Sequence, residues 1–223
     1  MKITLAPVLT TALLLAACGS KTDVNEKNFS IAISQYLDKK GKLCLGLSEW
    51  PVEISEGELR MKSTSPTVDY RRMSALETLG LVNSEETAVE ITDLFGKPSG
   101  HKQKVRRYTL TEKAKAFSIS WEAPNISSAL SGKKTTTSTD LCWGKKTLDK
   151  VVKWEGPMKL GDYQEARISY HYKILELADW AKDPGLQASF PQVTTFIENA
   201  GKKEERHGVK LTSIGWEAVG LEK

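Results

Sequence analysis

The sequence is poor in the residues that build catalytic and metal centres. Its 223 residues include only three cysteines and three histidines, which are His101, His171 and His207. None of these histidines has partners at the spacing of a metal site, and the chain has no HExxH, GxSxG, P-loop, GxGxxG or EF-hand motif. Two SxxK matches, at Ser99 and Ser131, lie in expected turns and lack the SDN and KTG elements of β-lactamases. We therefore expect no cofactor, no metal ion and no catalytic residue.

An excess of charge of one sign is also missing. The chain has 32 lysines and arginines against 28 aspartates and glutamates, a formal net charge of +4. This balance excludes the strongly basic class of nucleic-acid binders. The sequence is 39% hydrophobic and 27% charged, which excludes a disordered chain and provides enough apolar side chains for one globular domain or two small ones.

The N-terminus has the organisation of an export signal. Lys2 is followed by a mostly apolar stretch, residues 3–17, which is too short to span a bilayer comfortably. The stretch ends in Leu-Ala-Ala-Cys, and these four residues resemble the bacterial lipobox. The resemblance implies that residues 1–17 are a signal peptide and that Cys18 is the lipidated first residue of the mature protein. Several acyl chains on Cys18 would hold the protein stably on a membrane.

The residues after Cys18 indicate which membrane this is. Gly19 stands where an aspartate tends to retain bacterial lipoproteins at the inner membrane, so we expect the outer membrane, with the protein facing the periplasm. Residues 18–27 are polar and predict a tether that lets the folded part stand away from the bilayer. We expect the folded body to begin near Asn28.

Two cysteines remain in the mature chain, Cys44 and Cys142. An even number of thiols in an exported protein usually forms disulfides, so we predict a bond between these two. The alternative is two separately buried thiols. A metal site is a poor explanation, because no cluster of histidines accompanies the pair.

Two parts of the chain contain similar short segments in the same order. Leu-Cys-Leu-Gly at Cys44 corresponds to Leu-Cys-Trp-Gly at Cys142, and each half ends in a strand-like segment that leads through Leu-Thr into a helix-like run, over residues 106–117 and 207–219. This order predicts two related α+β halves, residues 28–122 and 140–223, joined by a linker that is rich in Ser and Thr, residues 123–139.

Hydrophobic periodicity predicts the elements of each half. In the first half we expect a helix over 28–39 that opens at Asn28 and ends at Gly41, a helix over 68–79, and a hairpin of strands 87–92 and 105–110. In the second half we expect strands over 148–154 and 166–174, a turn over 155–157, and helices over 175–182 and 191–200.

Residues 68–117 resemble the end of a winged-helix domain. The helix ending in ALETLGLV, the hairpin and the segment RRYTLTEKAKAF follow in the order of that fold, although Ala114 stands where such domains often have glycine. The resemblance implies a wing-like hairpin. Its basic side chains are expected partner-binding residues, and they include Lys102, Lys104, Arg106 and Arg107. A lipid-anchored exported protein meets no chromosome, so we expect no nucleic-acid partner. The alternatives for the basic run are a solvated wing and a contact for an anionic envelope polymer.

A longer resemblance concerns the segment LCWGKKTLDKVVKWEGPMKLGDYQEARISYHYKILELADWA, residues 141–181. It is similar to a group of mostly uncharacterised Gram-negative envelope lipoproteins, some named after carbapenem intrinsic-resistance clusters, and the likeness extends over most of the mature chain. The resemblance implies the compartment and no catalytic residue.

We therefore expect a non-catalytic envelope lipoprotein that binds a protein or a cell-wall component. The alternative is a small-molecule or β-lactam-related protection protein that acts without hydrolysis, and a third interpretation is an enzyme with a site that no motif reveals.

Overall fold

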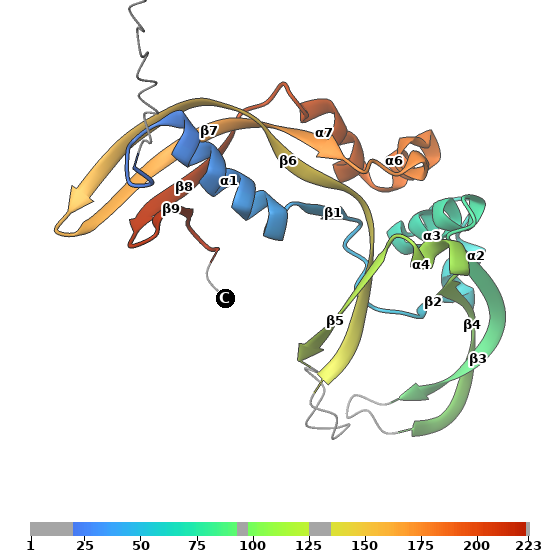
Figure 1. Ribbon diagram of the computed structural model, residues 1–223. Helices are drawn as coiled ribbons and strands as arrows, with labels where there is room; N and C mark the ends of the chain where they lie inside the picture. The colour runs from blue at the N-terminus through green and yellow to red at the C-terminus, as the bar shows by residue number, and fades with distance from the viewer. Residues whose placement is uncertain (1–19, 93–97, 125–134, 222–223) are drawn as a thin grey trace, which may run out of the picture.

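The computed structural model describes residues 20–92, 98–124 and 135–221, and it has a mixed α/β architecture in which antiparallel strands dominate. One sheet has six strands in the order β1-β6-β7-β8-β9, with β5 paired to β6 off this path, and the other has three in the order β2-β4-β3. Figure 1 shows an elongated molecule with β7, β8 and β9 at one end and the three-stranded sheet at the other, while β5 and the first part of β6 lie between them. The expected signal peptide, residues 1–17, and the expected lipidation site, Cys18, lie outside the described residues. No helix in the described part is long and apolar enough to cross a membrane.

The larger sheet is covered by one long helix. Its strands are β1 (Lys42–Cys44), β5 (Ser118–Pro124), β6 (Thr135–Leu160), β7 (Tyr163–Leu175), β8 (Glu205–Thr212) and β9 (Gly215–Ala218), and the helix is α1 (Glu26–Lys40). The buried residues of α1 include Phe29, Ile33 and Leu37, which recur at helical spacing. The Phe29 ring contacts the rings of Trp154 and Trp216, with centroids 5.4 and 5.1 Å apart. This apolar layer is the first of two cores.

The smaller sheet belongs to a second body that contains more helices. Its elements are β2 (Val52–Ser55), α2 (Glu56–Arg60), α3 (Val68–Thr78), β3 (Val82–Thr92), β4 (Pro98–Leu110) and α4 (Glu112–Lys115). Helices η1 (Asp179–Lys182), α6 (Pro184–Ser189) and α7 (Pro191–Asn199) complete the body. Met73 and Leu76 of α3 share the second core with Leu186, Phe190 and Val193, which come from a distant part of the chain.

Strand β6 joins the two bodies. Its 26 residues pair first with β5, then with β1 and finally with β7, and the pairing with β7 is interrupted by three irregularities. At the junction, Cys44 of β1 lies opposite Cys142 of β6, and the two sulfur atoms form a disulfide with an S–S distance of 2.04 Å. The predicted disulfide is therefore confirmed.

The end of α1 is fixed by a close approach to β6. Gly41 caps the helix as expected, and its N–H donates to the carbonyl oxygen of Leu37 over 2.8 Å. The N–H of Lys146 donates to the carbonyl oxygen of Gly41 over 2.7 Å. A Cβ atom at this position would collide with the carbonyl oxygens of both Leu37 and Lys146. Only glycine therefore lets the helix end lie directly against the strand.

The start of α1 corrects the predicted one. The N-cap is Asn25, whose side chain accepts a hydrogen bond from the N–H of Asn28 at 2.9 Å. Asn28 instead lies in the first turn and is buried. Its side-chain amide donates to the carbonyl oxygens of Ser20 and Asp23 over 2.8 and 2.9 Å. The expected tether at residues 18–27 is therefore partly folded, because its described residues, from Ser20 onward, are held against α1.

The other predicted elements are confirmed in type more than in length. The expected helix over 68–79 is α3, the one over 191–200 is α7, and the expected hairpin is β3–β4. The predicted short hairpins are wrong, since β4 and β7 have 13 residues each. Of the helix expected over 175–182, only the last turn is helical, as η1.

Three segments differ from their expected structure. The turn expected at 155–157 is an irregularity within the β6–β7 ladder, which continues to Leu160. The segment after Thr212 turns into strand β9 instead of a helix. Residues 135–139 of the expected linker are paired with β5, because a run of threonines suits a strand as well as a loop, and residues 125–134 lie outside the described part.

The packing crosses the expected boundary between two halves. Helix α1 from the first half packs on β6, β8 and β9 from the second, and α6 from the second half packs on α3 from the first. Each core is thus assembled from both parts of the chain.

Candidate binding site

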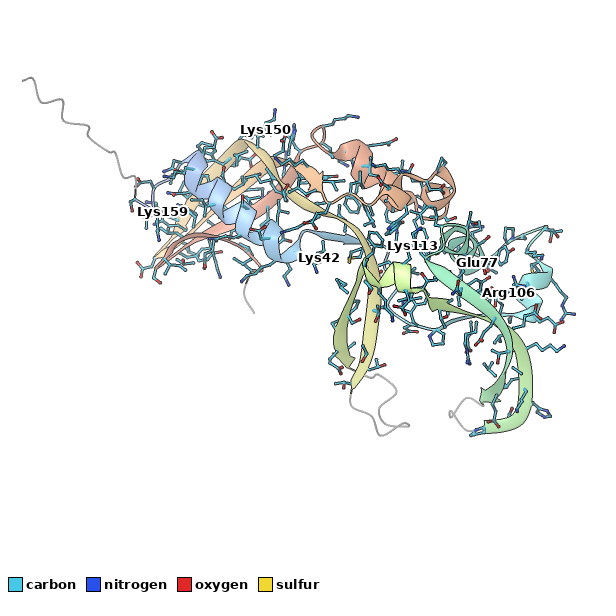
Figure 2. The ribbon with its side chains drawn as sticks, turned by 45° about the vertical axis from the view of Figure 1, so that its right-hand side comes forward. Lys42, Glu77, Arg106, Lys113, Lys150 and Lys159 are labelled. Carbon is cyan, nitrogen blue, oxygen red and sulfur yellow. A yellow bond between two sulfur atoms is a disulfide. The ribbon has the colours of Figure 1, made fainter. Side chains whose placement is uncertain are left out.

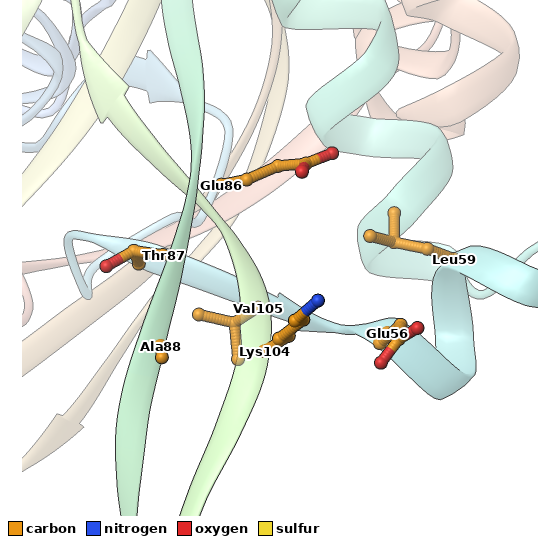
Figure 3. A pocket seen from close by; sticks show the side chains of 7 residues that line it. All are labelled: Glu56, Leu59, Glu86, Thr87, Ala88, Lys104 and Val105. Carbon is orange, nitrogen blue, oxygen red and sulfur yellow. The ribbon is translucent and has the colours of Figure 1, made fainter.

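A hollow lies between α2 and the β3–β4 hairpin. It has a volume of about 320 Å³, and it is lined by Glu56, Leu59, Glu86, Thr87, Ala88, Lys104 and Val105. Figure 3 shows Glu86 and Lys104 projecting from the hairpin toward the side on which α2 carries Glu56 and Leu59. The lining combines an apolar part with one lysine and two carboxylates, which is the composition of a binding site for a mixed polar and apolar ligand.

Local chemistry places α2 beside the hairpin. Ser55, the last residue of β2, forms a capping box with Glu58: its hydroxyl accepts from the N–H of Glu58 at 3.3 Å, and the Glu58 carboxylate accepts from the N–H of Ser55 at 3.0 Å. This box starts the helix directly after the strand. Strand β2 therefore ends at Ser55, and the chain after this residue forms α2 instead of continuing the ladder with β4.

The early end of β2 leaves one edge of β4 without a strand partner. Val52–Ser55 pair with Val105–Tyr108, whereas β4 begins at Pro98. In the described part of the chain, residues 98–104 thus pair with β3 on one side only. The hollow lies beside this free edge, since Lys104 and Val105 stand at the point where the pairing with β2 stops.

The four expected partner-binding cations all lie on β4, but they do not form a basic patch. Lys102 faces Glu90 of β3 in the strand register, and Arg106 faces Glu86. The Arg106 guanidinium is 3.5 Å from the Glu86 carboxylate. Acidic residues on the neighbouring strand therefore offset the charge of the basic strand.

Arg107 is bound more tightly than the other three cations. Its Nε and Nη2 atoms donate to Oε1 of Glu53 over 3.0 and 2.8 Å, across the β2–β4 ladder. Lys104 faces Ala88 in the register, and it is the expected residue that lines the hollow. The sequence analysis missed Glu53 and Glu86, because their role depends on strand register. It also missed Glu56, which reaches the hollow because α2 starts directly after β2.

A second groove lies at the end of α1 and has a volume of about 340 Å³. In it, Nζ of Lys146 is 2.5 Å from Oε1 of Glu205 and lies over the rings of Tyr172 and Phe196, 4.4 and 4.5 Å from their centroids. The Tyr170 hydroxyl donates to Oε2 of Glu205 over 3.2 Å. The cation and the carboxylate of this groove are therefore already engaged with each other.

The two phenols of this cluster hold their protons strongly. Burial, and secondly the charge of Glu205, raises the pKa of Tyr172 to about 12. The same two causes raise the pKa of Tyr170 further. Both side chains are neutral at physiological pH, so they can donate hydrogen bonds but cannot act as bases.

The three histidines are separated in the fold. His101 is exposed on β4, His171 lies on β7, and the ring of His207 packs against Tyr36 with centroids 3.9 Å apart. Nε2 of His207 is 2.8 Å from the carbonyl oxygen of Val219. Among the described residues, no group of three or more His, Cys, Asp or Glu side chains could hold a metal ion.

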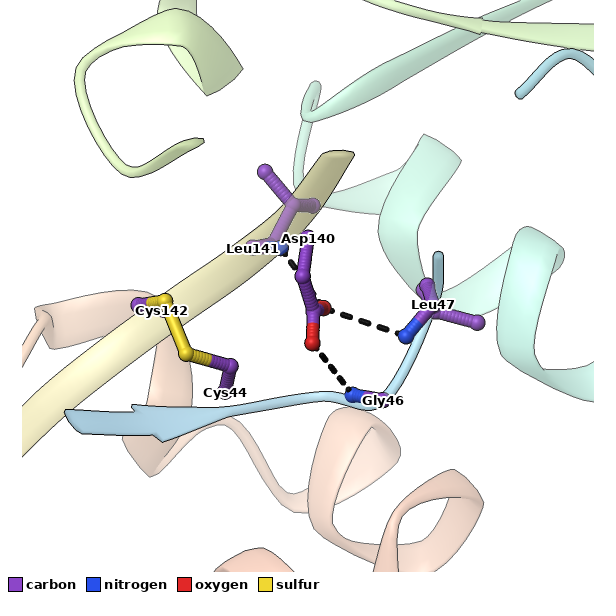
Figure 4. The surroundings of a disulfide bond; sticks show 6 residues. All are labelled: Cys44, Gly46, Leu47, Asp140, Leu141 and Cys142. Carbon is purple, nitrogen blue, oxygen red and sulfur yellow. Dashed lines mark hydrogen bonds between the residues drawn. A yellow bond between two sulfur atoms is a disulfide. The ribbon is translucent and has the colours of Figure 1, made fainter. Parts of the chain in front are cut away.

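The disulfide is reinforced by a buried carboxylate that the sequence analysis missed. Asp140 accepts from the N–H groups of Gly46, Leu47 and Leu141 over 2.9, 3.1 and 2.7 Å (Figure 4). It thereby ties the segment after β1 to β6, next to the bond between Cys44 and Cys142. The available signal was an acidic residue inside a strand-like run, directly before the Leu-Cys pair.

Comparisons with known proteins identify no relative: no family model, no curated protein and no solved structure matches this chain.

Proposed function

We propose that this protein is a non-catalytic lipoprotein of the bacterial cell envelope that binds an extended segment of a protein partner beside strand β4. Lipidation at Cys18 after removal of residues 1–17 would hold it on the outer membrane, facing the periplasm. The lipobox-like residues and the Cys44–Cys142 disulfide, which is typical of an oxidising compartment, support this placement.

The observation that carries the binding proposal is the free edge of β4 at residues 98–104, with the hollow at its end. Unpaired backbone groups at a sheet edge can accept an added strand, and side-chain pockets along the edge then select the sequence that binds. The order β2-β4-β3 beside α3 supports the comparison with a winged helix, in which the hairpin would be the wing.

The mixed charges of the hairpin favour a protein over an anionic cell-wall polymer. Glu86 and Glu53 already engage Arg106 and Arg107, so a polyanion would meet acidic side chains beside every arginine. The second groove supports the small-ligand alternative less well, because its Lys146 and Glu205 bind each other.

Site-specific photocrosslinking in cells tests this proposal. A photoreactive amino acid replaces Lys104 in the full lipidated chain, and the matched control carries it at Lys150, an exposed lysine of β6. We expect a crosslinked envelope protein from position 104 only, and we expect Ala88→Trp, which fills the hollow, to abolish it. Equal products at both positions, or a product that a cell-wall hydrolase digests, would contradict the proposal.

A further inference from the structure

Two exposed apolar turns lie at the end of the larger sheet. Leu160 and Tyr163 flank the β6–β7 turn, and Ile214 lies in the β8–β9 turn. Leu160 is 82% exposed, Met158 is 75% exposed and Ile214 is 70% exposed, the three most exposed large apolar side chains in the described part of the chain. Apolar side chains at a tip gain no packing within the molecule, which points to an external contact.

The two turns lie at the same end of the strands of the larger sheet. Glu165 of β7 faces Lys210 of β8, and in each strand only two residues lie between this pair and the turn. Figure 1 shows the β6–β7 and β8–β9 turns at the same end of the molecule, where α1 also begins. In Figure 2, Lys159 marks this end and Arg106 lies at the opposite one.

The first residues that the structure describes are bound directly to the β8–β9 hairpin. Nε1 of Trp216 donates to the carbonyl oxygen of Thr22 over 3.1 Å. Gly215, with φ +125°, lies so close to Lys21 that a Cβ atom there would be 3.1 Å from the Lys21 carbonyl oxygen. Ser20 is held in turn by the side chain of Asn28. Ser20 and the residues that follow it are therefore part of the folded body.

Ser20 is two positions after Cys18, and an extended chain spans roughly 3.5 Å per residue, so the reach is about 7 Å. A lipid on Cys18 would be buried in the bilayer, and a reach this short would not let the β8–β9 turn leave the membrane surface. Tyr163 adds an amphipathic ring, which suits the boundary between apolar and polar layers.

We infer that the β6–β7 and β8–β9 turns insert Leu160, Met158 and Ile214 into the surface of the bilayer that holds the lipid. This inference rests on the proposed lipid anchorage. It gives the molecule one orientation, in which the β3–β4 hairpin at the opposite end faces away from the membrane and is free to meet a partner.

Spin labels on the full lipidated protein test the orientation. Leu160→Cys and Ile214→Cys are labelled without reduction, and the matched control is Met61→Cys, at an exposed apolar residue of the other body. The proteins are reconstituted in vesicles of phosphatidylethanolamine and phosphatidylglycerol. We expect the ratio of oxygen accessibility to that of a water-soluble nickel complex to be several-fold higher at positions 160 and 214 than at 61.

The outcomes separate the inference from the anchorage. Flotation of the protein with the vesicles reports the lipid anchor, and the labels report the orientation. If the protein floats but both turn labels are as accessible to nickel as the label at position 61, the inference is overturned and the anchorage stands. Spin–spin broadening at 160 or 214 would overturn it in favour of a second copy of this chain. A mature protein that does not float overturns the anchorage and the inference together.

Discussion

The cores of the two bodies of this molecule are built from different numbers of chain segments. The larger sheet buries its apolar face under one helix, α1, which comes from the opposite end of the sequence. The smaller sheet relies on a core assembled from four places: the segment after β1, helix α3, strand β6 and helices η1 to α7. The first body thus depends on one contact surface, and the second on the joint placement of several segments.

The difference extends to the free surfaces. The larger sheet carries its most exposed apolar side chains, Leu160, Met158 and Ile214, at or next to its turns. The smaller sheet extends a hairpin whose outer part, at residues 98–104, has no buried residue. A partner can therefore bind the outer part of the hairpin without disturbing either core.

The largest expected effect is the loss of the contact surface under α1. Phe29→Ala removes a fully buried ring that lies between two tryptophans, and truncation of such a residue costs about 3–5 kcal/mol of unfolding free energy. Urea denaturation measures the change. Ile31→Ala on the exposed side of the same helix is the control and should cost less than about 0.5 kcal/mol. Equal costs would show that α1 does not close this core.

The disulfide ties the two bodies together at β1 and β6. Replacing both Cys44 and Cys142 with serine should lower the unfolding free energy by about 2–5 kcal/mol, because the unfolded chain loses a loop closure across 98 positions. Thermal and urea unfolding of the two proteins measure the difference. Alkylation of both thiols in the unreduced wild-type protein would contradict the premise.

The carboxylate beside the disulfide should matter somewhat less. Asp140→Ala leaves the N–H groups of Gly46, Leu47 and Leu141 without their acceptor, which we expect to cost about 2–3 kcal/mol. Asp149→Ala, at an exposed aspartate of the same strand, is the control and should be nearly neutral. Comparable losses in the two variants would indicate a general effect of charge instead of a buried anchor.

A pH dependence is expected from a buried tyrosine in the core of the larger sheet. The pKa of Tyr172 is raised by burial to about 12, whereas an unfolded tyrosine titrates near about 10. Above the lower value the unfolded state loses protons first, so this contribution is fully present below about pH 10 and is lost as the pH rises toward about 12. Tyr172→Phe should therefore show a weaker fall of unfolding free energy in urea titrations across this window. Parallel falls would exclude a role for this phenol.

The smallest effect concerns the ion pair on the smaller sheet. Arg107 and Glu53 are each about one third exposed, and such pairs contribute less than about 1 kcal/mol. A double-mutant cycle with Arg107→Ala and Glu53→Ala measures this coupling in urea. A coupling above about 2 kcal/mol would mean that the pair organises the β2–β4 ladder.

Local patterns predicted much of the secondary structure. The apolar residues Phe29, Ile31, Ile33 and Leu37 predicted α1, although Ile31 is exposed. The alternation along β7 predicted one buried face, made of Ala166, Ile168, Tyr170, Tyr172 and Ile174, and one exposed face, and all of the first set except Ile174 are buried. The prediction failed at Ser169, which is also buried although it alternates with them. Periodicity describes one covered face, and it cannot identify a strand that is covered on both.

The candidate site was only partly accessible to the same reasoning. The cations of β4 were identified, but their acidic partners were not, because Glu53 is 54 positions from Arg107 and only the strand register brings them together. The free edge of β4 depends on the residue at which β2 ends. A capping box at Ser55 sets this end, and the sequence analysis did not consider it.

The sequence by itself determined the α3 and α7 helices, the β3–β4 hairpin and the identity of the cysteine pair, because these follow from spacing along the chain or from the number of cysteines. Only the tertiary structure decided that α1 covers strands from the far end of the chain, that Asp140 binds the N–H groups of Gly46 and Leu47, and that Thr22 is bound to Trp216 of β9. These contacts join residues far apart in sequence. Their choice depends on the free energy of the whole packed chain, which no local pattern encodes.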